Sequence, residues 1–372
     1  MDSSFRWNDG LTIDRRGFVA VGSAAFLSAC ATTGTRRDLA CSALPSVNVD
    51  PSRVVRTVAG LRPYRASGFV VRRDPFGDKA VVHNYGHGGA GITLSWGSSR
   101  LATNLGLPGH SGPVAVIGAG VMGLTTARLV QEAGFPVTIY TAALSPDTTS
   151  NVAGGQISPF GHFSEDAVTP EWRAQFVAAM AYSWSRFQLM TGDKYGVRWL
   201  PTYEESRRTE PTAYESFMPD WRVLSRGDHP FDLENVVRYR TMYVETPRFL
   251  RQLTADVLGA GGKILLRRFT TPADLGTLPE TLVFNCTGIG ARDLFGDADL
   301  HPVRGQLAVL QPQPEVLYAA AGSWGYMFPR LDGILLGGTF ERDVWDTTPV
   351  PATIDRIVRS HRDFFGSFRC TA

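Results

Sequence analysis

The chain has 372 residues, of which 43% are hydrophobic and 19% are charged, so it can bury one large core or two modest ones. Its formal net charge of +2 argues against a nucleic-acid-binding protein, because so small an excess of positive charge attracts phosphate only weakly. The four cysteines form neither a zinc-type pair nor the framework of a disulfide-rich domain.

The first 30 residues are predicted to be a targeting segment. Asp14–Val19 (DRRGFV) resembles a bacterial twin-arginine export signal, and a weakly hydrophobic stretch from Phe18 to Ala29 follows it. This stretch is too short to span a bilayer as a permanent helix. It ends in Leu27–Cys30 (LSAC), which resembles a lipobox, where the cysteine is lipidated. We expect twin-arginine export to the periplasm, and two alternatives stay open for Cys30: a lipid anchor in the membrane, or a plain residue near a conventional cleavage site.

Between this signal and the first glycine cluster the pattern is irregular. Residues 31–51 lack periodicity and are predicted to be a flexible tether. Residues 52–76 contain alternating segments interrupted by proline and glycine, and a short apolar strand at 79–83 runs into glycines. We expect a helix over 92–105, and the Gly- and Pro-rich residues 106–113 are the clearest internal linker.

A βαβ unit follows the linker. Val114–Ile117 is predicted to be a buried strand, the next helix ends near Gly134, and a second strand spans 137–140. The turn between strand and helix carries a Gly-x-Gly-x-x-Gly pattern, whose glycines permit close approach of a pyrophosphate to the backbone and to the helix N-terminus. The predicted cofactor contacts in this turn are Gly118, Ala119, Gly120, Val121, Met122 and Gly123.

The acidic residue that normally binds the ribose of such a cofactor is missing. The second strand ends in Tyr140–Ala143 (YTAA), and the nearest acid is Asp147, several residues farther on. Downstream, the patterns predict helices over 171–190, 246–258 (with Thr246 as N-cap) and 354–365, a buried strand at 282–286, and strands at 306–310, 326–328 and 334–336.

A second glycine block precedes the first one. His83–Thr93 (HNYGHGGAGIT) matches the C-terminal flavin-binding signature of the D-amino-acid oxidase family almost position by position, whereas that family normally begins with the fingerprint found here at Gly118. The resemblance implies FAD as cofactor, with flavin contacts from Gly88, Gly89, Ala90, Gly91, Ile92 and Thr93. His83 and His87 could be read as a metal pair, but no carboxylate or cysteine ligand is near in sequence, so we favour packed histidines and expect no metal.

Other segments resemble the same family. Gly60–Arg65 (GLRPYR) is similar to the motif whose first arginine binds the substrate carboxylate, which implies that role for Arg62. Gly325–Arg330 (GYMFPR) is similar to the segment whose tyrosine donates to the same carboxylate, which implies Tyr326, and the carbonyl of Gly89 would receive the substrate amine. Two more segments imply FAD contacts from Thr148, Thr149, Ser150, Gly154, Gly155, Gln156 and Thr287. Cys286, beside Thr287, is predicted to be a buried packing thiol.

Each family block occurs once, in a rotated order, which indicates a circular permutation in which 106–113 joins the ancestral ends. We therefore expect an α/β fold with two regions. A Rossmann-like FAD-binding region with a parallel central sheet would comprise residues 77–165 and 245–305. A substrate-binding region with a mixed or antiparallel sheet would comprise 52–76, 166–244 and 306–372. Failure of 80–83 to join the sheet of 114–117 would contradict this arrangement.

The resemblance implies FAD-dependent oxidative deamination of a D-amino acid to a 2-oxo acid, ammonia and hydrogen peroxide, with the Cα hydrogen leaving as hydride. The partners would be the amino acid and either molecular oxygen or a membrane electron acceptor. Alternatives are an oxidase of glycine or N-methyl amino acids, a respiratory-chain-linked D-amino-acid dehydrogenase, and a non-catalytic flavin-binding lipoprotein. For an acidic substrate, the candidate second cations are Arg65, Arg330 and Arg342. Residues 311–325 are expected to form a lid.

Changing both Arg15 and Arg16 to Lys is expected to keep the protein in the cytoplasm, because the export pathway reads the arginine pair. Cell fractionation measures this, and the same change at Arg36 and Arg37, which follow the signal, is the control. Unchanged export of the Arg15/Arg16 variant would contradict the targeting prediction.

Overall fold

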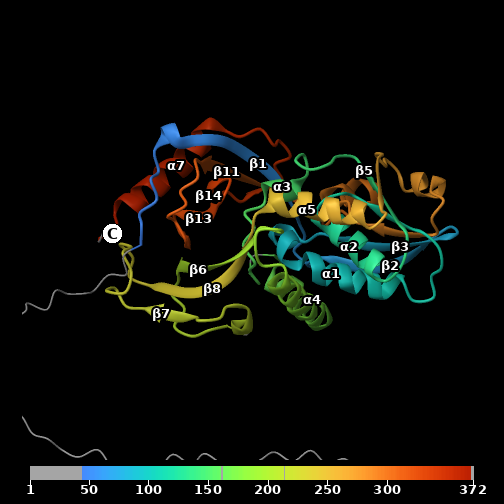
Figure 1. Ribbon diagram of the computed structural model, residues 1–372, viewed down its shortest axis with the longest axis horizontal. Helices are drawn as coiled ribbons and strands as arrows, with labels where there is room; N and C mark the ends of the chain where they lie inside the picture. The colour runs from blue at the N-terminus through green and yellow to red at the C-terminus, as the bar shows by residue number, and fades with distance from the viewer. Residues whose placement is uncertain (1–43, 161, 213, 370–372) are drawn as a thin grey trace, which may run out of the picture. The chain divides into compact units, whose positions relative to one another are not determined.

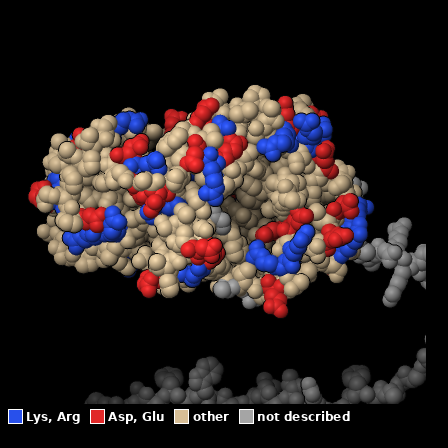
Figure 2. All heavy atoms as spheres, turned by 180° about the vertical axis from the view of Figure 1, so that it is seen from behind, with Lys and Arg blue, Asp and Glu red and all other residues tan. Residues whose placement is uncertain are grey.

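The computed structural model describes residues 44–160, 162–212 and 214–369, and the predicted signal with Cys30 lies outside them. Their strands form two sheets, one of six strands and one of nine (Figure 1). No helix in the described ranges is both long and apolar enough to cross a membrane. On the face seen in Figure 2, Lys and Arg are interspersed with Asp and Glu, so this face presents no continuous basic stripe.

The six-stranded sheet contains five parallel strands and one antiparallel edge strand. In spatial order the strands are β2 (Val70–Phe76), β3 (Lys79–Tyr85), β10 (Leu282–Asn285), β4 (Val114–Ile117), β5 (Val137–Thr141) and β9 (Lys263–Leu266). Every residue of β4 and β10 is buried, which explains why both read as continuous apolar runs.

β10 lies between the two strands that lead into the glycine blocks. Phe284 pairs with Val82 of β3 on one side and with Val116 of β4 on the other, both in parallel register. The expectation that residues 80–83 share a sheet with 114–117 is therefore confirmed. Because all three strands point the same way, both glycine turns emerge at one carboxyl edge of the sheet.

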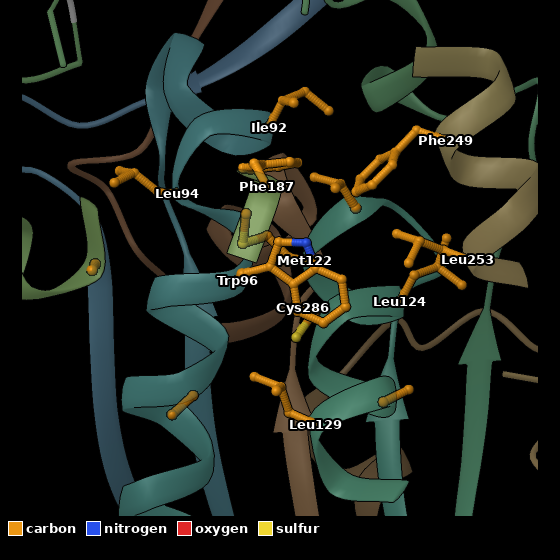
Figure 3. Close-up of a cluster of buried hydrophobic side chains, with 14 of the residues drawn as sticks. Ile92, Leu94, Trp96, Met122, Leu124, Leu129, Phe187, Phe249, Leu253 and Cys286 are labelled. Carbon is orange, nitrogen blue, oxygen red and sulfur yellow. The ribbon is translucent and has the colours of Figure 1, made fainter. Parts of the chain in front are cut away.

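Helices from distant parts of the chain cover one face of this sheet. α1 (Gly91–Gly106) packs beside α2 (Val121–Glu132), α4 (Pro170–Leu189) packs on α1, and α5 (Thr246–Gly259) packs on α2. Figure 3 shows where they meet, with Trp96, Met122, Phe187 and Phe249 converging from the four helices. α4 thus belongs to the core of the six-stranded sheet, although we expected it in the substrate-binding region.

The nine-stranded sheet is mixed, as expected, and almost wholly antiparallel. Its spatial order is β1 (Val54–Tyr64), β11 (His301–Leu310), β14 (Gly333–Gly337), β13 (Gly325–Arg330), β12 (Ala319–Gly322), β6 (Val197–Glu205), β8 (Val236–Val244) and β7 (Arg222–Leu224), with β15 (Glu341–Arg342) also paired to β11. α7 (Pro351–Gly366) packs on β11, β13 and β14. Two short helices, α3 (Thr149–Val152) and α6 (Ala291–Phe295), complete the α-helical elements of the described ranges.

Strand membership differs from the expected boundaries at two points. Residues 52–76 divide between the sheets, because β1 joins the nine-stranded sheet and β2 joins the six-stranded one. The turn of Gly77 and Asp78 is only two residues long, with Gly77 at φ +59°, so β2 must pair with β3 as a hairpin. β11 also runs unbroken across the expected boundary at residue 305, because nearly all of it pairs with β1.

The last part of the predicted flexible tether is ordered and docked, so that prediction is wrong for residues 44–51. Val47 and Val49 are 3% and 5% exposed and pack in one cluster with Tyr318 and Phe365. The hydroxyl of Tyr318 donates to the carbonyl of Pro45 at 2.9 Å. Alternation of two valines with polar residues is a strand-like pattern, but it is too short to be recognised in the sequence.

One helix start also differs from expectation. Thr246 is the first residue of α5, and Glu245 occupies the N-cap position. The hydroxyl of Thr246 donates to the carbonyls of Asn151 and Ala153, at 3.2 and 3.3 Å. It therefore ties the helix to the α3 loop instead of capping it.

Val47→Ala is expected to lower the free energy of unfolding by about 2 kcal/mol, since it removes two buried methyl groups and leaves a cavity. Chemical denaturation of the FAD-loaded protein measures the change. The control is Val55→Ala in β1, where the valine is 56% exposed and the expected effect is within about 0.5 kcal/mol. Equal effects of the two substitutions would mean that residues 44–51 do not contribute to the core.

Candidate functional site

The carboxyl edge of the six-stranded sheet opens into a cavity of about 680 Å³. Both glycine blocks line the cavity, and the nine-stranded sheet contributes Arg62, Gly305, Tyr326 and Phe328. The motifs found separately in the sequence therefore share one site. Three predicted contacts, Ala90, Thr93 and Gly123, do not line it.

The fingerprint turn is shaped by close backbone contacts. Gly118 has φ +105°, and a Cβ there would lie 2.5 Å from the carbonyl oxygen of Cys286. A Cβ on Gly123 would lie 1.8 Å from the carbonyl oxygen of Gly118. Gly123 is therefore needed for the close packing of the turn, although it does not line the cavity. The backbone N–H of Val121 donates to Ser150 Oγ at 3.0 Å and so joins two predicted cofactor segments.

Two helices begin at this cavity, and of their first N–H groups that of Val121 already donates to Ser150 Oγ. α2 starts after Gly120 and α1 starts after Ala90, and neither N-cap residue accepts a backbone hydrogen bond through its side chain. The first N–H groups of a helix carry positive partial charge and lack partners within the helix. One such end suits a pyrophosphate and the other suits the negatively charged edge of a reduced flavin, so the donors present fit FAD.

Thr93, a predicted flavin contact, uses its hydroxyl to join two segments of the protein. Its Oγ1 donates to the carbonyl of Gln156 and accepts from the N–H of Ser158, both at 3.2 Å. The hydroxyl is therefore occupied within the protein. It holds the segment around Gln156 against the start of α1, and that segment lines the cavity.

The cavity lining beside β5 includes residues that the sequence did not place at the site. Thr141 Oγ1 accepts from the N–H of Ala119 at 3.1 Å and so connects β5 to the fingerprint turn. Asp147 lines the cavity despite its distance along the chain, together with Arg267, Arg268 and Phe269. The last three follow β9, and only the pairing of β9 with β5 brings them here.

Arg62 of β1 also lines the cavity, and its charge is available. Its Nη1 donates to the carbonyl of Thr339 at 3.0 Å, and no ion pair with a carboxylate is found for it within the described ranges. A Cβ on Gly305 would come within 2.6 Å of both terminal nitrogens, so this glycine leaves room for the guanidinium. The ring of Phe340 lies 5.8 Å from the Arg62 Cζ atom.

Tyr326 lies close enough to Arg62 for the guanidinium to act on its phenol. Its ring packs against the backbone of Gly337 and stacks on Phe328 with 4.5 Å between ring centres. Burial raises the pKa of Tyr326, and the neighbouring Arg62 opposes part of that rise. The phenol therefore stays protonated at neutral pH and can donate a hydrogen bond.

Gly89 lies against Arg62 and against a histidine that no motif indicated. A Cβ on Gly89 would lie 3.6 Å from Arg62 Cδ and 4.0 Å from His162 Nδ1. His162 is 8% exposed and lines the cavity. Its Nε2 is 2.7 Å from the carbonyl oxygen of Ser158. An isolated histidine in a loop carries no spacing signal, so only the folded loop reveals it.

The side chains of His83, His87 and Cys286 are all buried. His83 Nδ1 lies 2.9 Å from Asn285 Nδ2, and His87 Nε2 lies 2.9 Å from Ser98 Oγ. No group of three or more possible metal ligands occurs within the described ranges. Cys286 is buried, which raises the pKa of its thiol to about 12 and makes it unreactive.

The expected lid is not formed by residues 319–325. Ala319–Gly322 is strand β12, which pairs with β13 through a turn of Ser323 and Trp324. Trp324 stacks on Phe364 of α7, with ring centres 3.9 Å apart, so the turn is held away from the cavity. Strand pairing on both edges of β12 leaves this segment no freedom to close over a ligand.

Comparison with known proteins identifies the family of this chain. The chain matches the family described as FAD dependent oxidoreductase over residues 16–105 and 113–371. It is similar to D-amino-acid oxidase of Streptomyces coelicolor, at 33% identity over 67% of this chain and 77% of that protein. It is also similar to human D-aspartate oxidase, at 30% identity over 63% of this chain and 71% of that protein.

A solved structure supports the fold. Glycine oxidase from Geobacillus kaustophilus superimposes with a TM-score of 0.53 at 17% identity, covering 70% of this chain and 80% of that one. The predicted enzyme class and cofactor are thus confirmed. The chain belongs to the family of FAD-dependent oxidoreductases that resemble D-amino-acid oxidase, and its cofactor is FAD.

Proposed function

We propose that this enzyme catalyses the oxidative deamination of D-amino acids to 2-oxo acids, ammonia and hydrogen peroxide. The observation that carries the proposal is the Arg62 guanidinium, which has no carboxylate partner within the described ranges and lies in the cavity beside the Tyr326 phenol. A planar guanidinium and a phenol together match the two oxygens of a carboxylate. The similarity to D-amino-acid oxidase and D-aspartate oxidase supports the same substrate class.

In this proposal the protein mainly positions the substrate. Arg62 binds the carboxylate through two N–H donors, Tyr326 donates to one of its oxygens, and the Gly89 carbonyl accepts an N–H of the neutral amine. Bound FAD would accept the hydride that leaves Cα, and oxygen would then be reduced to hydrogen peroxide. The oxidised substrate is an imine, which takes up water and gives the 2-oxo acid and ammonia. A deprotonated amine needs no side-chain base, so orientation provides most of the catalysis.

Three related activities remain as alternatives: oxidation of glycine, oxidation of an N-methyl amino acid, and transfer of electrons to a membrane quinone instead of oxygen. Stopped-flow reoxidation of the reduced enzyme with oxygen and with a quinone separates an oxidase from a dehydrogenase. A non-catalytic flavin-binding lipoprotein is disfavoured because Arg62 and Tyr326 are both present. A peroxide assay of the purified protein across D-amino acids tests that alternative.

We also propose that the chain is a circular permutation of the family fold. The permutation is supported by β3 and β4 flanking β10, with residues 107–113 joining α1 to β4. The two ends of the described chain also meet, since Ser46 Oγ donates to the carbonyl of Phe365 at 2.8 Å. Such a rearrangement requires that a linker join the ancestral ends and that the new ends lie close together.

Export remains a proposal supported by the sequence. A chain that loads FAD in the cytoplasm must cross the membrane folded, and the twin-arginine route carries folded proteins. Attachment to the membrane would then occur only through a lipid on Cys30. Metabolic labelling with a fatty acid, compared with a Cys30→Ser variant, tests the anchor.

Arg62→Leu is expected to lower kcat/KM for D-alanine by about 10²-fold or more, because a charge-assisted pair with the carboxylate is lost. FAD should stay bound, as its visible absorption spectrum shows, since Arg62 holds substrate and not cofactor. Arg56→Leu is the matched control on the same strand, because the Arg56 side chain is 50% exposed and its ion pair with Asp332 is at the surface. Undiminished activity of Arg62→Leu would reject the proposed role.

Acidic D-amino acids are a second candidate substrate class because one of the three candidate second cations is available. Arg65 pairs with Asp297 at 3.0 Å, and Arg330 pairs with Asp332. Arg342 has no such partner in the described ranges, and its guanidinium lies 5.3 Å from the ring centre of Phe340. That ring lines the cavity and also contacts Arg62.

If an acidic side chain reaches Arg342, Arg342→Leu should lower kcat/KM for D-aspartate about fivefold and leave D-alanine within about twofold, because an exposed ion pair is worth about 1 kcal/mol. Arg342→Lys, which keeps the charge, is the control. Equal effects on both substrates, or a native enzyme that prefers D-alanine, would remove acidic amino acids from consideration.

A further inference from the structure

His162 lines the cavity and carries a buried ring nitrogen that has no hydrogen-bond partner within the described ranges. The side chain is 8% exposed, and Nδ1 is a buried polar atom without a hydrogen-bond partner within the described ranges. Buried polar atoms normally have partners, so an unpaired one in a ligand cavity indicates an atom that a ligand contacts. The two proposed carboxylate-binding groups, Arg62 and Tyr326, line the same cavity.

The other ring nitrogen determines what Nδ1 can do. Nε2 lies 2.7 Å from the carbonyl oxygen of Ser158, which can only accept, so Nε2 must carry the proton. Burial lowers the pKa of His162 to about 4, and the ring is therefore neutral near pH 7. Nδ1 then has a free lone pair and acts as a hydrogen-bond acceptor.

The position of this acceptor fits an amino acid held by Arg62. A Cβ atom added to Gly89 would lie 3.9 Å from Arg62 Nε and 4.0 Å from His162 Nδ1. The two nitrogens thus flank the same backbone position, one offering a donor and the other an acceptor. An α-amino acid needs this combination at neighbouring points, because its carboxylate accepts and its amine donates.

We propose that His162 Nδ1 accepts a hydrogen bond from the α-amino group of the substrate, as a second acceptor beside the Gly89 carbonyl. The inference rests on the proposed function and identifies a specificity-determining contact within that site. Two acceptors orient two N–H bonds of the neutral amine and leave its lone pair free to stabilise the carbon from which hydride departs. A carboxylic acid that lacks the amine would leave Nδ1 unpaired and forgo this contact.

Two substitutions distinguish the roles of the two nitrogens of the His162 ring. His162→Gln can place an amide nitrogen near the position of Nε2 and keep the contact with Ser158, but it removes the acceptor at Nδ1. His162→Asn can place an amide oxygen near the position of Nδ1 and keep the acceptor, but it loses the contact with Ser158. The readouts, on FAD-loaded protein, are KM and kcat/KM for D-alanine and the inhibition constant of propionate, which is the same acid without the amine.

The expected result is a fall of about tenfold or more in kcat/KM for D-alanine in His162→Gln, carried mainly by KM, since a hydrogen bond to the substrate is lost. Its propionate inhibition constant should stay within about twofold of the native value. His162→Asn should recover most of the D-alanine activity.

Other outcomes overturn the proposal in distinguishable ways. Equal loss of D-alanine and propionate binding in both variants would make His162 structural. A shifted flavin absorption spectrum or weaker FAD binding in His162→Gln would place Nδ1 against the cofactor. A native enzyme that binds FAD but oxidises no D-amino acid would reject the proposed function, and this inference with it. Oxidation by the native enzyme with unchanged kinetics in His162→Gln would reject the inference alone.

Discussion

The pairing of β10 with both β3 and β4 is the constraint on which the rest of the structure depends. A four-residue strand, Leu282–Asn285, is buried between two strands that are separated from each other by a helix and a linker. Parallel register on both sides brings the ends of β3 and β4 to one edge. Without that register the start of α1 and the start of α2 would not share a cavity, and two weak anion sites would not combine into one cofactor site.

The second sheet completes the site by supplying charge and shape. Arg62 on β1 reaches the cavity because β1 pairs along most of its length with β11, where Gly305 leaves space for the guanidinium. Tyr326 on β13 lies close to Gly337 of the neighbouring strand β14. Small residues on adjacent strands therefore make room for the two large polar side chains. The cavity of about 680 Å³ that these side chains line would be costly to leave empty in a packed interior, which is consistent with a site built to receive a ligand.

Sequence patterns were most informative where chemistry is local. The two glycine blocks, the buried strands beside them and the motifs around Arg62 and Tyr326 could be recognised because a tight turn or a helix start imposes requirements on residues that are neighbours in the chain. The failures share a different cause. Docking of Val47 and Val49, formation of strand β12 in place of a lid, and placement of Asp147 and Arg267 at the cavity all depend on contacts with segments far away in the sequence.

By itself, the sequence determined the family, the cofactor and the identity of the groups proposed to bind a carboxylate, because each rests on a short motif with its own physical requirement. Tertiary structure alone decided which groups share the site and in what state. His162 became a candidate only when its loop placed Nε2 on the carbonyl of Ser158 and left Nδ1 without a hydrogen-bond partner in a residue that lines the cavity. Arg342 differs from Arg65 and Arg330 in that each of the other two forms an ion pair with a nearby aspartate. The folded chain determines how deeply each of these side chains is buried and which groups it contacts. Burial and contacts in turn set the protonation state of a side chain and whether it is free to bind a ligand, so no local pattern could predict them.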